Sequence, residues 1–340
     1  MISSRTLTAL FVAGATLGST TIYVAAQRTP APAPGARTAA AKPWSPPRLP
    51  DGQPDISGVY SNATYTPFER PANLGDREFY TPEEAAAIAK QRLDALHNQP
   101  RDAVHYDDAI WMSEKSPRGM TTLRTSIITE PKNGRLPPMT DEGRKRQQER
   151  QAAAKARGGA LDMAQNRSLS ERCIIWQHEG PPIVPTGYNS NVQIHQGIGY
   201  VVIMHEMMRD PRIIPLDGRP HLTPALRKLR GDSRGRWEGN TLVIETTNFT
   251  ERTAFRGASE AQRVIERITP VDKDTLSYQF TVEDPKTWAA PWSGEVPMIR
   301  TEDKMYEYAC HEGNYGIRNI LSAQRAAEAE AAGAARGSRE

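Results

Sequence analysis

Residues 275–282 have the sequence TLSYQFTV, in which polar and apolar side chains alternate without a break. In an extended strand, Leu276, Tyr278, Phe280 and Val282 lie on one face, and the polar side chains between them lie on the other. Such alternation is typical of an antiparallel sheet that has one buried face and one face in water. The segment therefore predicts a mainly β, antiparallel fold.

Similar β-prone runs, separated by short turns, fill the chain from Cys173 to Cys310. Apart from a weak pattern at 224–229, the sequence shows no helix between them long enough to connect parallel strands, so we expect an up-and-down barrel or a sandwich. In the predicted strand 200–207, the side chains on both faces are largely apolar up to His205 and Glu206. This pattern predicts a strand that is buried on both sides, or one whose polar end opens into a cavity. The predicted strands are 174–176, 192–195, 200–207, 212–216, 241–248, 263–269, 275–282, 295–300 and 305–310.

Residues 1–26 have the pattern of a signal peptide. Arg5 supplies a positive start, residues 7–24 are mostly apolar or small, and Val24-Ala25-Ala26 resembles a signal peptidase site. A retained N-terminal membrane anchor is the alternative, although threonine and glycine interrupt the apolar run. We expect residues 27–50, which are rich in proline and alanine, to form a disordered linker.

Residues 51–170 are expected to form an N-terminal arm whose helices pack on the barrel. Thr81-Pro82-Glu83-Glu84 predicts a helix start, because threonine caps, proline suits the first turn and acidic side chains face the helix dipole. Residues 141–160 are charged on nearly every side, which predicts a solvated helix or a mobile connector. The antiparallel β domain is expected to span 171–322, and 323–340 to form an alanine-rich helix or frayed tail.

The charge balance and the cysteines limit the classes of function. The chain carries 43 basic and 40 acidic side chains, and charges of both signs are interleaved, so no dense basic stripe is available for nucleic acid. Cys173 and Cys310 are the two cysteines. In an oxidising compartment we expect them to form a disulfide, and two buried free thiols are the alternative.

Histidines and carboxylates on the predicted strands supply the candidate catalytic groups. His205-Glu206 begins like the metalloprotease pattern H-E-x-x-H, but Arg209 occupies the place of the second histidine and the segment is predicted to be a strand. No spacing in the sequence demands a metal site, so we predict no metal and no cofactor. A site in which His195 and His205 bind a metal together with His311 or Glu307 is the alternative. His195 or His205 is the candidate general base, with Glu206 or Glu307 as its carboxylate partner. The alternative is that these side chains make ordinary cross-strand hydrogen bonds.

A second set of polar and aromatic side chains is predicted to bind a ligand. Aspartate and arginine alternate between residues 209 and 238, which predicts either ion pairs between near neighbours or guanidinium groups that bind a carboxylate or phosphate. Aromatic side chains beside proline and glycine favour a ligand pocket, and core packing is their alternative role. The candidate ligand-binding residues are Trp237, Tyr308, Arg212, Arg236, Asn191 and Tyr188.

Several long phrases carry a resemblance to a known family. RIIPLDGRPHL, GDSRGRWEGNTLVIETTNFT, YEYACHEGNYGIRNIL, SIITEPKNGRLPPMT and ERCIIWQHEGPPIVPTGYNSNVQI resemble a family of exported bacterial proteins without an assigned activity, over roughly residues 50–320. The resemblance implies a single exported domain. Gly58-Val59-Tyr60 is also similar to the Gly-x-Trp at the start of lipocalins, with tyrosine in place of tryptophan, which implies a calycin-like barrel.

These observations predict a periplasmic or secreted protein that binds a small, partly apolar ligand in a β-barrel cavity. A hydrolase, lyase or isomerase with a histidine base and a carboxylate is one alternative, because the same barrel can hold an active site. A structural envelope protein that binds other proteins through exposed apolar patches is another. We expect a monomer or a small homo-oligomer, without a membrane span once the signal peptide is removed.

Overall fold

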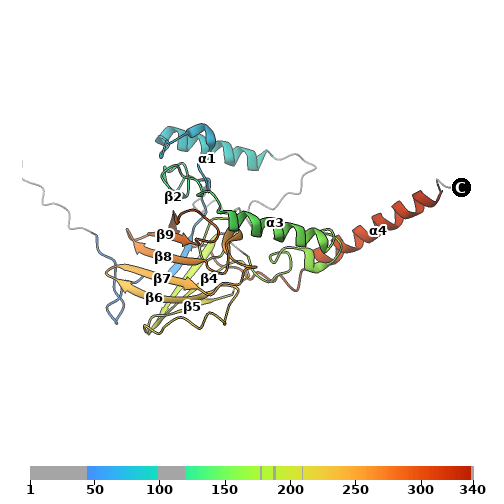
Figure 1. Cartoon of the computed structure of the whole chain (residues 1–340). Helices are drawn as coiled ribbons and strands as arrows, with labels where there is room; N and C mark the ends of the chain where they lie inside the picture. Colours follow the sequence, from blue (N-terminus) through green and yellow to red (C-terminus); the bar gives the residue numbers. More distant parts are fainter. Residues whose placement is uncertain (1–43, 99–118, 177, 187–188, 209, 338–340) are drawn as a thin grey trace, which may run out of the picture. The chain divides into compact units, whose positions relative to one another are not determined.

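The computed structural model describes residues 44–98, 119–176, 178–186, 189–208 and 210–337 (Figure 1). The predicted signal peptide and most of the predicted linker lie outside these ranges. Within the described residues, no helix is both long and apolar enough to cross a membrane.

The described strands form one 10-stranded sheet, in which every pair of neighbours is antiparallel. They are β1 (Gly58–Ser61), β2 (Ile128–Glu130), β3 (Asn191–Gly197), β4 (Tyr200–His205), β5 (Arg212–Pro215), β6 (Asp232–Glu238), β7 (Thr241–Thr247), β8 (Arg263–Pro270), β9 (Thr275–Glu283) and β10 (Trp292–Arg300). The order is β5-β4-β3-β1-β10-β9-β8-β7-β6, and β2 pairs with β10. β3, β4 and β5 are neighbours in chain order, and so are β6 to β10, whereas β1 lies between β3 and β10.

The sheet curls until its two ends meet. β5 and β8 are six positions apart in the strand order, which in a flat sheet would separate them by about 29 Å at roughly 4.8 Å per strand. Yet Arg212 on β5 and Glu266 on β8 form an ion pair of 2.9 Å. At the sheet's end, a Cβ atom at Gly235 of β6 would approach Ile214 Cγ2 of β5 to within 2.8 Å. The fold is therefore a nearly closed antiparallel barrel, which confirms the predicted fold class.

β9 confirms the alternation that the sequence predicts. Leu276, Tyr278, Phe280 and Val282 are at most 2% exposed, whereas the side chains between them are half-buried or exposed. The same inward faces of the other long strands complete a continuous apolar core. β1 and β2 come from residues 51–170, so this predicted arm contributes strands to the barrel itself.

Four local predictions are wrong. No strand forms at 174–176 or at 305–310. A β-prone run becomes a strand only where it can pair with the edge of another strand, and both of these runs lie in loops next to the disulfide-bonded cysteines. The weak helical pattern at 224–229 contains turns instead. β6 is missing from the predicted strands because two of its inward positions carry Ser233 and Gly235 rather than large apolar side chains.

Among the described residues, three α-helices lie outside the sheet. α1 (Pro82–His97) begins as predicted, because Thr81 and Glu84 form a capping box in which each side chain accepts the main-chain N–H of the other. α3 (Asp141–Ala156) confirms the helical alternative for residues 141–160, and α4 (Tyr315–Gly337) confirms the C-terminal helix. The 3-10 helices are η1 (Ala72–Leu74), η2 (Ala164–Asn166) and η3 (Phe255–Gly257).

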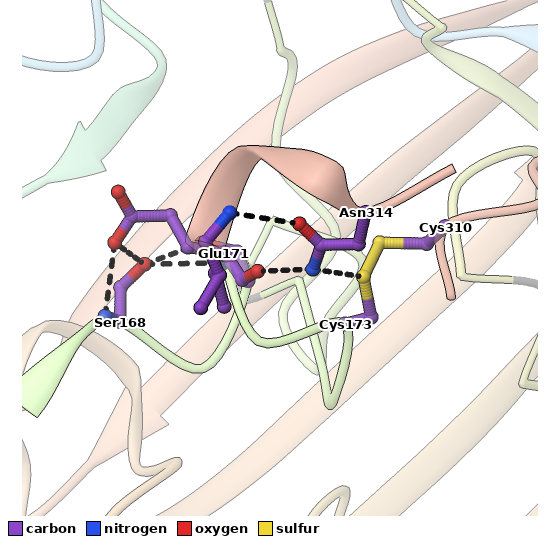
Figure 2. The surroundings of a disulfide bond; sticks show 7 residues. Ser168, Glu171, Cys173, Cys310 and Asn314 are labelled. Atoms are coloured by element: carbon purple, nitrogen blue, oxygen red, sulfur yellow. Dashed lines mark hydrogen bonds between the residues drawn. A yellow bond between two sulfur atoms is a disulfide. The ribbon is translucent and has the colours of Figure 1, made fainter. Parts of the chain in front are cut away.

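A disulfide joins Cys173 to Cys310, with 5.7 Å between their Cα atoms. Figure 2 shows the side chain of Asn314 beside it: Nδ2 donates to the main-chain oxygen of Glu171 at 2.9 Å and lies 3.2 Å from Cys173 Sγ. The predicted bridge is confirmed, and the alternative of two free thiols is excluded. The bond connects the loop that precedes β3 to the residues that precede α4.

Candidate functional site

Polar side chains gather inside one end of the barrel, where β4, β7 and β9 end and β5, β6 and β8 begin. His205 ends β4 and shares its inward face with Val201 and Ile203; the opposite face of this strand is only partly covered. Arg212 begins β5, and Arg230 lies just before β6. His205, Arg212 and Arg230 each keep 7% of their surface exposed, so they lie directly beneath this end of the barrel.

Glu266 and Tyr278 extend the polar group deeper into the barrel, and both are 0% exposed. Glu266 Oε1 accepts hydrogen bonds from Arg212 Nη2 at 3.0 Å and from the hydroxyl of Tyr278 at 2.8 Å. The main-chain N–H of Ile183 donates to the same hydroxyl at 2.7 Å. Burial and the nearby Glu266 charge raise the pKa of Tyr278 well above its ordinary value, so the hydroxyl stays a neutral donor.

Residues 179–184, which we call the plug segment, cover this end of the barrel. All six are buried, and a β-bridge between Glu179 and Ile183 folds the segment back on itself. The carboxylate of Glu179 forms an ion pair with Arg230, whose Nε also donates to Asp210 at 3.0 Å. Arg230 thus ties the plug segment to the loop that precedes β5.

The charges of this site nearly balance. Burial raises the pKa of Glu179 to about 7 against the opposing effect of Arg230, so part of this carboxyl is protonated at neutral pH. Burial, together with the charges of Arg230 and Arg212, holds the pKa of His205 well below its ordinary value, and the imidazole is neutral. Two permanent positive charges are therefore balanced by Glu266, by the exposed Asp210 and by a partly protonated Glu179.

Some buried polar atoms of this site have no hydrogen-bond partner among the described residues. They include Nε and Nη1 of Arg212, Nη1 of Arg230 and Oε1 of Glu179. Leaving a buried donor without an acceptor costs about 1–3 kcal/mol. Guanidinium N–H groups form a planar fork that matches a carboxylate, so this arrangement suits a small anionic group. We call Arg212, Arg230, His205, Glu179, Glu266 and Tyr278 the polar cluster.

The structure separates the predicted catalytic residues. His205 belongs to the polar cluster, but His195 is exposed on the outer face of β3, next to the buried Ile194. The sheet therefore does not bring the two imidazoles together, as a shared site would require. Glu307 is exposed in the loop after β10, and Glu206 is buried beyond the end of β4.

Two of the predicted polar residues do meet each other. Asn191 Nδ2 donates to Glu206 Oε2 at 3.0 Å, and the main-chain N–H of Tyr306 donates to Glu206 Oε1 at 3.3 Å. Asn191 belongs to the outward set of β3, because the next residue, Val192, is the buried one. Through its two carboxylate oxygens, Glu206 thus connects the start of β3 and the chain after β10 to the end of β4, outside the barrel.

The predicted ligand-binding residues are dispersed. Arg212 lies in the polar cluster, whereas Arg236 faces outward and pairs with Glu238 at 2.7 Å. Trp237 packs on the core toward the other end of β6. Tyr308 is half-buried in the loop after β10, and Tyr188 lies outside the described residues.

Sequence reasoning missed four members of the polar cluster as site residues. Glu266 left a signal, because alternation through 263–270 (RVIERITP) places it on the inward face between Val264 and Ile268. A charged side chain at a core position indicates a buried ion pair or a functional site. Tyr278 was predicted as a core residue, and no local pattern distinguishes Glu179 or Arg230.

The fold and the polar cluster define an antiparallel β-barrel protein with buried arginines beneath a plug segment. Comparisons with protein-family models, with curated proteins and with solved structures find no match to this chain. The resemblances to exported bacterial proteins and to lipocalins therefore stay predictions. Within the described ranges, no three histidine, cysteine or acidic side chains are grouped so that they could hold a metal ion.

Glu179 is expected to make stability depend on pH in a defined direction. Its pKa is about 7 in the folded protein and about 4.3 in an unfolded chain, so folding favours the protonated form. This contribution is fully present below about pH 4.3 and is lost as the pH rises through about 7. Between about pH 4.5 and 7.5, the native protein should lose up to about 3 kcal/mol more free energy of unfolding than Glu179→Gln.

Urea unfolding of both proteins at the two pH values checks this expectation. Glu149→Gln, on the exposed face of α3, is the matched control, since its side chain is 64% exposed, and it should leave the pH dependence of the native protein unchanged. Parallel curves for the native protein and Glu179→Gln would contradict the burial of a proton-binding Glu179.

Proposed function

We propose that the protein binds a small, partly apolar ligand at the polar cluster, and that Arg212 and Arg230 receive a carboxylate of this ligand. The observation that carries the proposal is the pair of buried guanidinium groups. Nε and Nη1 of Arg212 and Nη1 of Arg230 have no acceptor among the described residues. A carboxylate between them would supply acceptors for these donors.

The surroundings of the cluster support a ligand with an apolar part. Val192 lies opposite His205 on the neighbouring strand, and Ile203 lies opposite Arg212; both aliphatic side chains are about 1% exposed. Ligand sites are typically apolar with a few placed polar groups. A ligand larger than a few atoms would have to displace the plug segment, and protonation of Glu179 would weaken the ion pair that holds this segment.

The disulfide supports a location outside the reducing cytosol. Structural disulfides persist in the periplasm and in secreted proteins and are rare in cytosolic ones. Together with the predicted signal peptide, the Cys173–Cys310 bond favours a periplasmic or secreted protein. A small ligand would then be taken from the periplasm or from the medium.

Thermal unfolding in the presence of decanoate and of decanol tests the ligand proposal. The two probes share an apolar chain and differ in the anionic group, so we expect decanoate to raise Tm and decanol to have little effect. Arg212→Lys keeps the positive charge but loses the planar fork, and it should weaken decanoate binding by roughly tenfold. Arg236→Lys, on the outer face of β6, is the matched control and should bind as the native protein does.

Two outcomes would overturn the ligand proposal. Equal shifts with decanoate and decanol would mean that the anionic group is not recognised. An unchanged affinity in Arg212→Lys would remove the polar cluster as the site.

An acid–base enzyme is the second candidate, because the pKa of Glu179 is about 7. A carboxyl with a pKa near the working pH is suited to proton transfer, and perturbed groups gather at active sites. The neutral His205 supplies a second proton acceptor in the same cluster. Hydrolysis of p-nitrophenyl butyrate is the test: we expect a rate that changes near pH 7 and that Glu179→Gln abolishes, and a rate equal to that of buffer would exclude esterase activity of this kind.

A further inference from the structure

A second concave site lies outside the barrel, between α3, the loop after β7 and the segment before Cys173. It is a pocket of about 590 Å³ whose lining includes Arg150, Arg157, Arg172 and Arg252. Arg150 and Arg157 are about two helical turns apart, so they project from the same face of α3. The volume lies within the range of about 300–1,000 Å³ that is usual for sites that bind small molecules.

The pocket carries positive charge that its own acid does not neutralise. Glu251 is the one acidic residue of the lining, and it already pairs with Arg150 Nη2 at 2.8 Å. Arg150 also donates to the main-chain oxygens of Gly257 and Ala258 at 3.2 Å each, so it connects α3 to the loop after β7. The lining arginines for which the described residues supply no ion pair are Arg157, Arg172 and Arg252.

The three remaining arginines come from three different segments: the C-cap of α3, the segment before Cys173 and the loop after β7. Arg157 is the C-cap residue of α3, and its main-chain oxygen accepts a hydrogen bond from Asn166 Nδ2 at 3.1 Å. Arg172 is half-buried and directly precedes the disulfide-bonded Cys173, and its N–H donates to the main-chain oxygen of Ser168 at 3.2 Å. Like charges held around one concavity repel one another, and a multiply charged anion relieves this repulsion.

We propose that this pocket binds a small molecule that carries a di- or polyphosphate group. Guanidinium forks bind phosphate oxygens in pairs. A ligand with two or more negative charges matches three arginines that have no ion pair among the described residues better than a single carboxylate does. The pocket also has room for more than the phosphate group itself. This site is separate from the polar cluster, and the inference does not depend on the ligand proposed there.

Calorimetric titration of the full chain with inorganic pyrophosphate tests the proposal. We expect saturable binding that weakens as NaCl rises from about 20 to 200 mM. Removing two of the unpaired arginines, in Arg172→Gln/Arg252→Gln, should weaken binding by at least roughly tenfold. Arg92→Gln, an exposed arginine on α1, removes a charge elsewhere and should leave the affinity unchanged.

Two further measurements make the test specific. Citrate carries similar charge without phosphate geometry, and we expect it to bind more weakly than pyrophosphate at equal ionic strength; equal binding would overturn the phosphate class. Arg212→Lys should bind pyrophosphate as the native protein does, because the polar cluster is a different site. If pyrophosphate shows no saturable binding, or if Arg92→Gln loses as much affinity as the double variant, the pocket is not the binding site.

Discussion

Replacing Glu266 with leucine is expected to lower the free energy of unfolding by about 3–5 kcal/mol. Glu266 is 0% exposed and Arg212 is 7% exposed, so the substitution leaves a guanidinium charge buried beside apolar side chains. It also removes the acceptor of the Tyr278 hydroxyl, which donates to Glu266 at 2.8 Å. The loss should appear in urea unfolding as a lower midpoint with little change in slope.

The double variant Arg212→Leu/Glu266→Leu separates the ion pair from simple packing. Because removing both partners leaves no unpaired charge, we expect it to be more stable than Glu266→Leu alone. Glu238→Gln is the control, since Glu238 pairs with Arg267 at the same 2.9 Å but both side chains are about 40% exposed, and it should change stability by less than about 1 kcal/mol. If the double variant instead loses as much free energy of unfolding as the two single variants together, burial of the ion pair does not determine its contribution to stability.

If Glu266→Leu fails to fold, a milder substitution can still test the polar cluster. Tyr278→Phe removes one hydroxyl and keeps both charged partners, so it should fold and lose about 1–2 kcal/mol. The main-chain N–H of Ile183, which donates to this hydroxyl, then also lacks its acceptor. Urea unfolding of this variant therefore probes the same cluster with a smaller change.

Local sequence patterns predicted the elements whose signals are complete within a few residues. The alternation of 275–282 defines β9, and Thr81 with Glu84 defines the start of α1, because both patterns carry their own physical cause. β6 was missed because Gly235 faces the core: a Cβ atom there would come within 2.6 Å of Leu216 Cδ2. The small residue is required by Leu216 just after β5, and by Ile214 within it, across the barrel seam. This requirement cannot be seen in the sequence of β6 itself.

The site was harder to predict because its ion pairs join distant parts of the chain. The sequence suggested that arginines pair with acids a few residues away, and this holds for Arg236 with Glu238 on the surface. The buried Arg212 instead pairs with Glu266, 54 residues later in the chain. Such a pair forms only after the barrel closes, so His205 and Arg212 could be selected from the sequence but their partners could not.

Replacing both cysteines with serine is expected to lower the free energy of unfolding by about 5 kcal/mol in the chain-entropy model. Cys173 and Cys310 are 137 residues apart, so their bond removes many conformations from the unfolded chain. Serine is similar in size to cysteine and can keep the contact with Asn314 Nδ2, so the folded surroundings change little (Figure 2). Urea unfolding of the oxidised protein and of the double variant measures the difference.

The slope of the unfolding transition shows which state the disulfide acts on. An unfolded chain without the cross-link exposes more surface, so the urea m-value of Cys173→Ser/Cys310→Ser should rise while its midpoint falls. If the midpoint and the m-value stay unchanged, the bond would restrain only local opening of residues 168–173 and the start of α4. Faster amide hydrogen exchange confined to those residues would then identify the smaller unit that the disulfide holds.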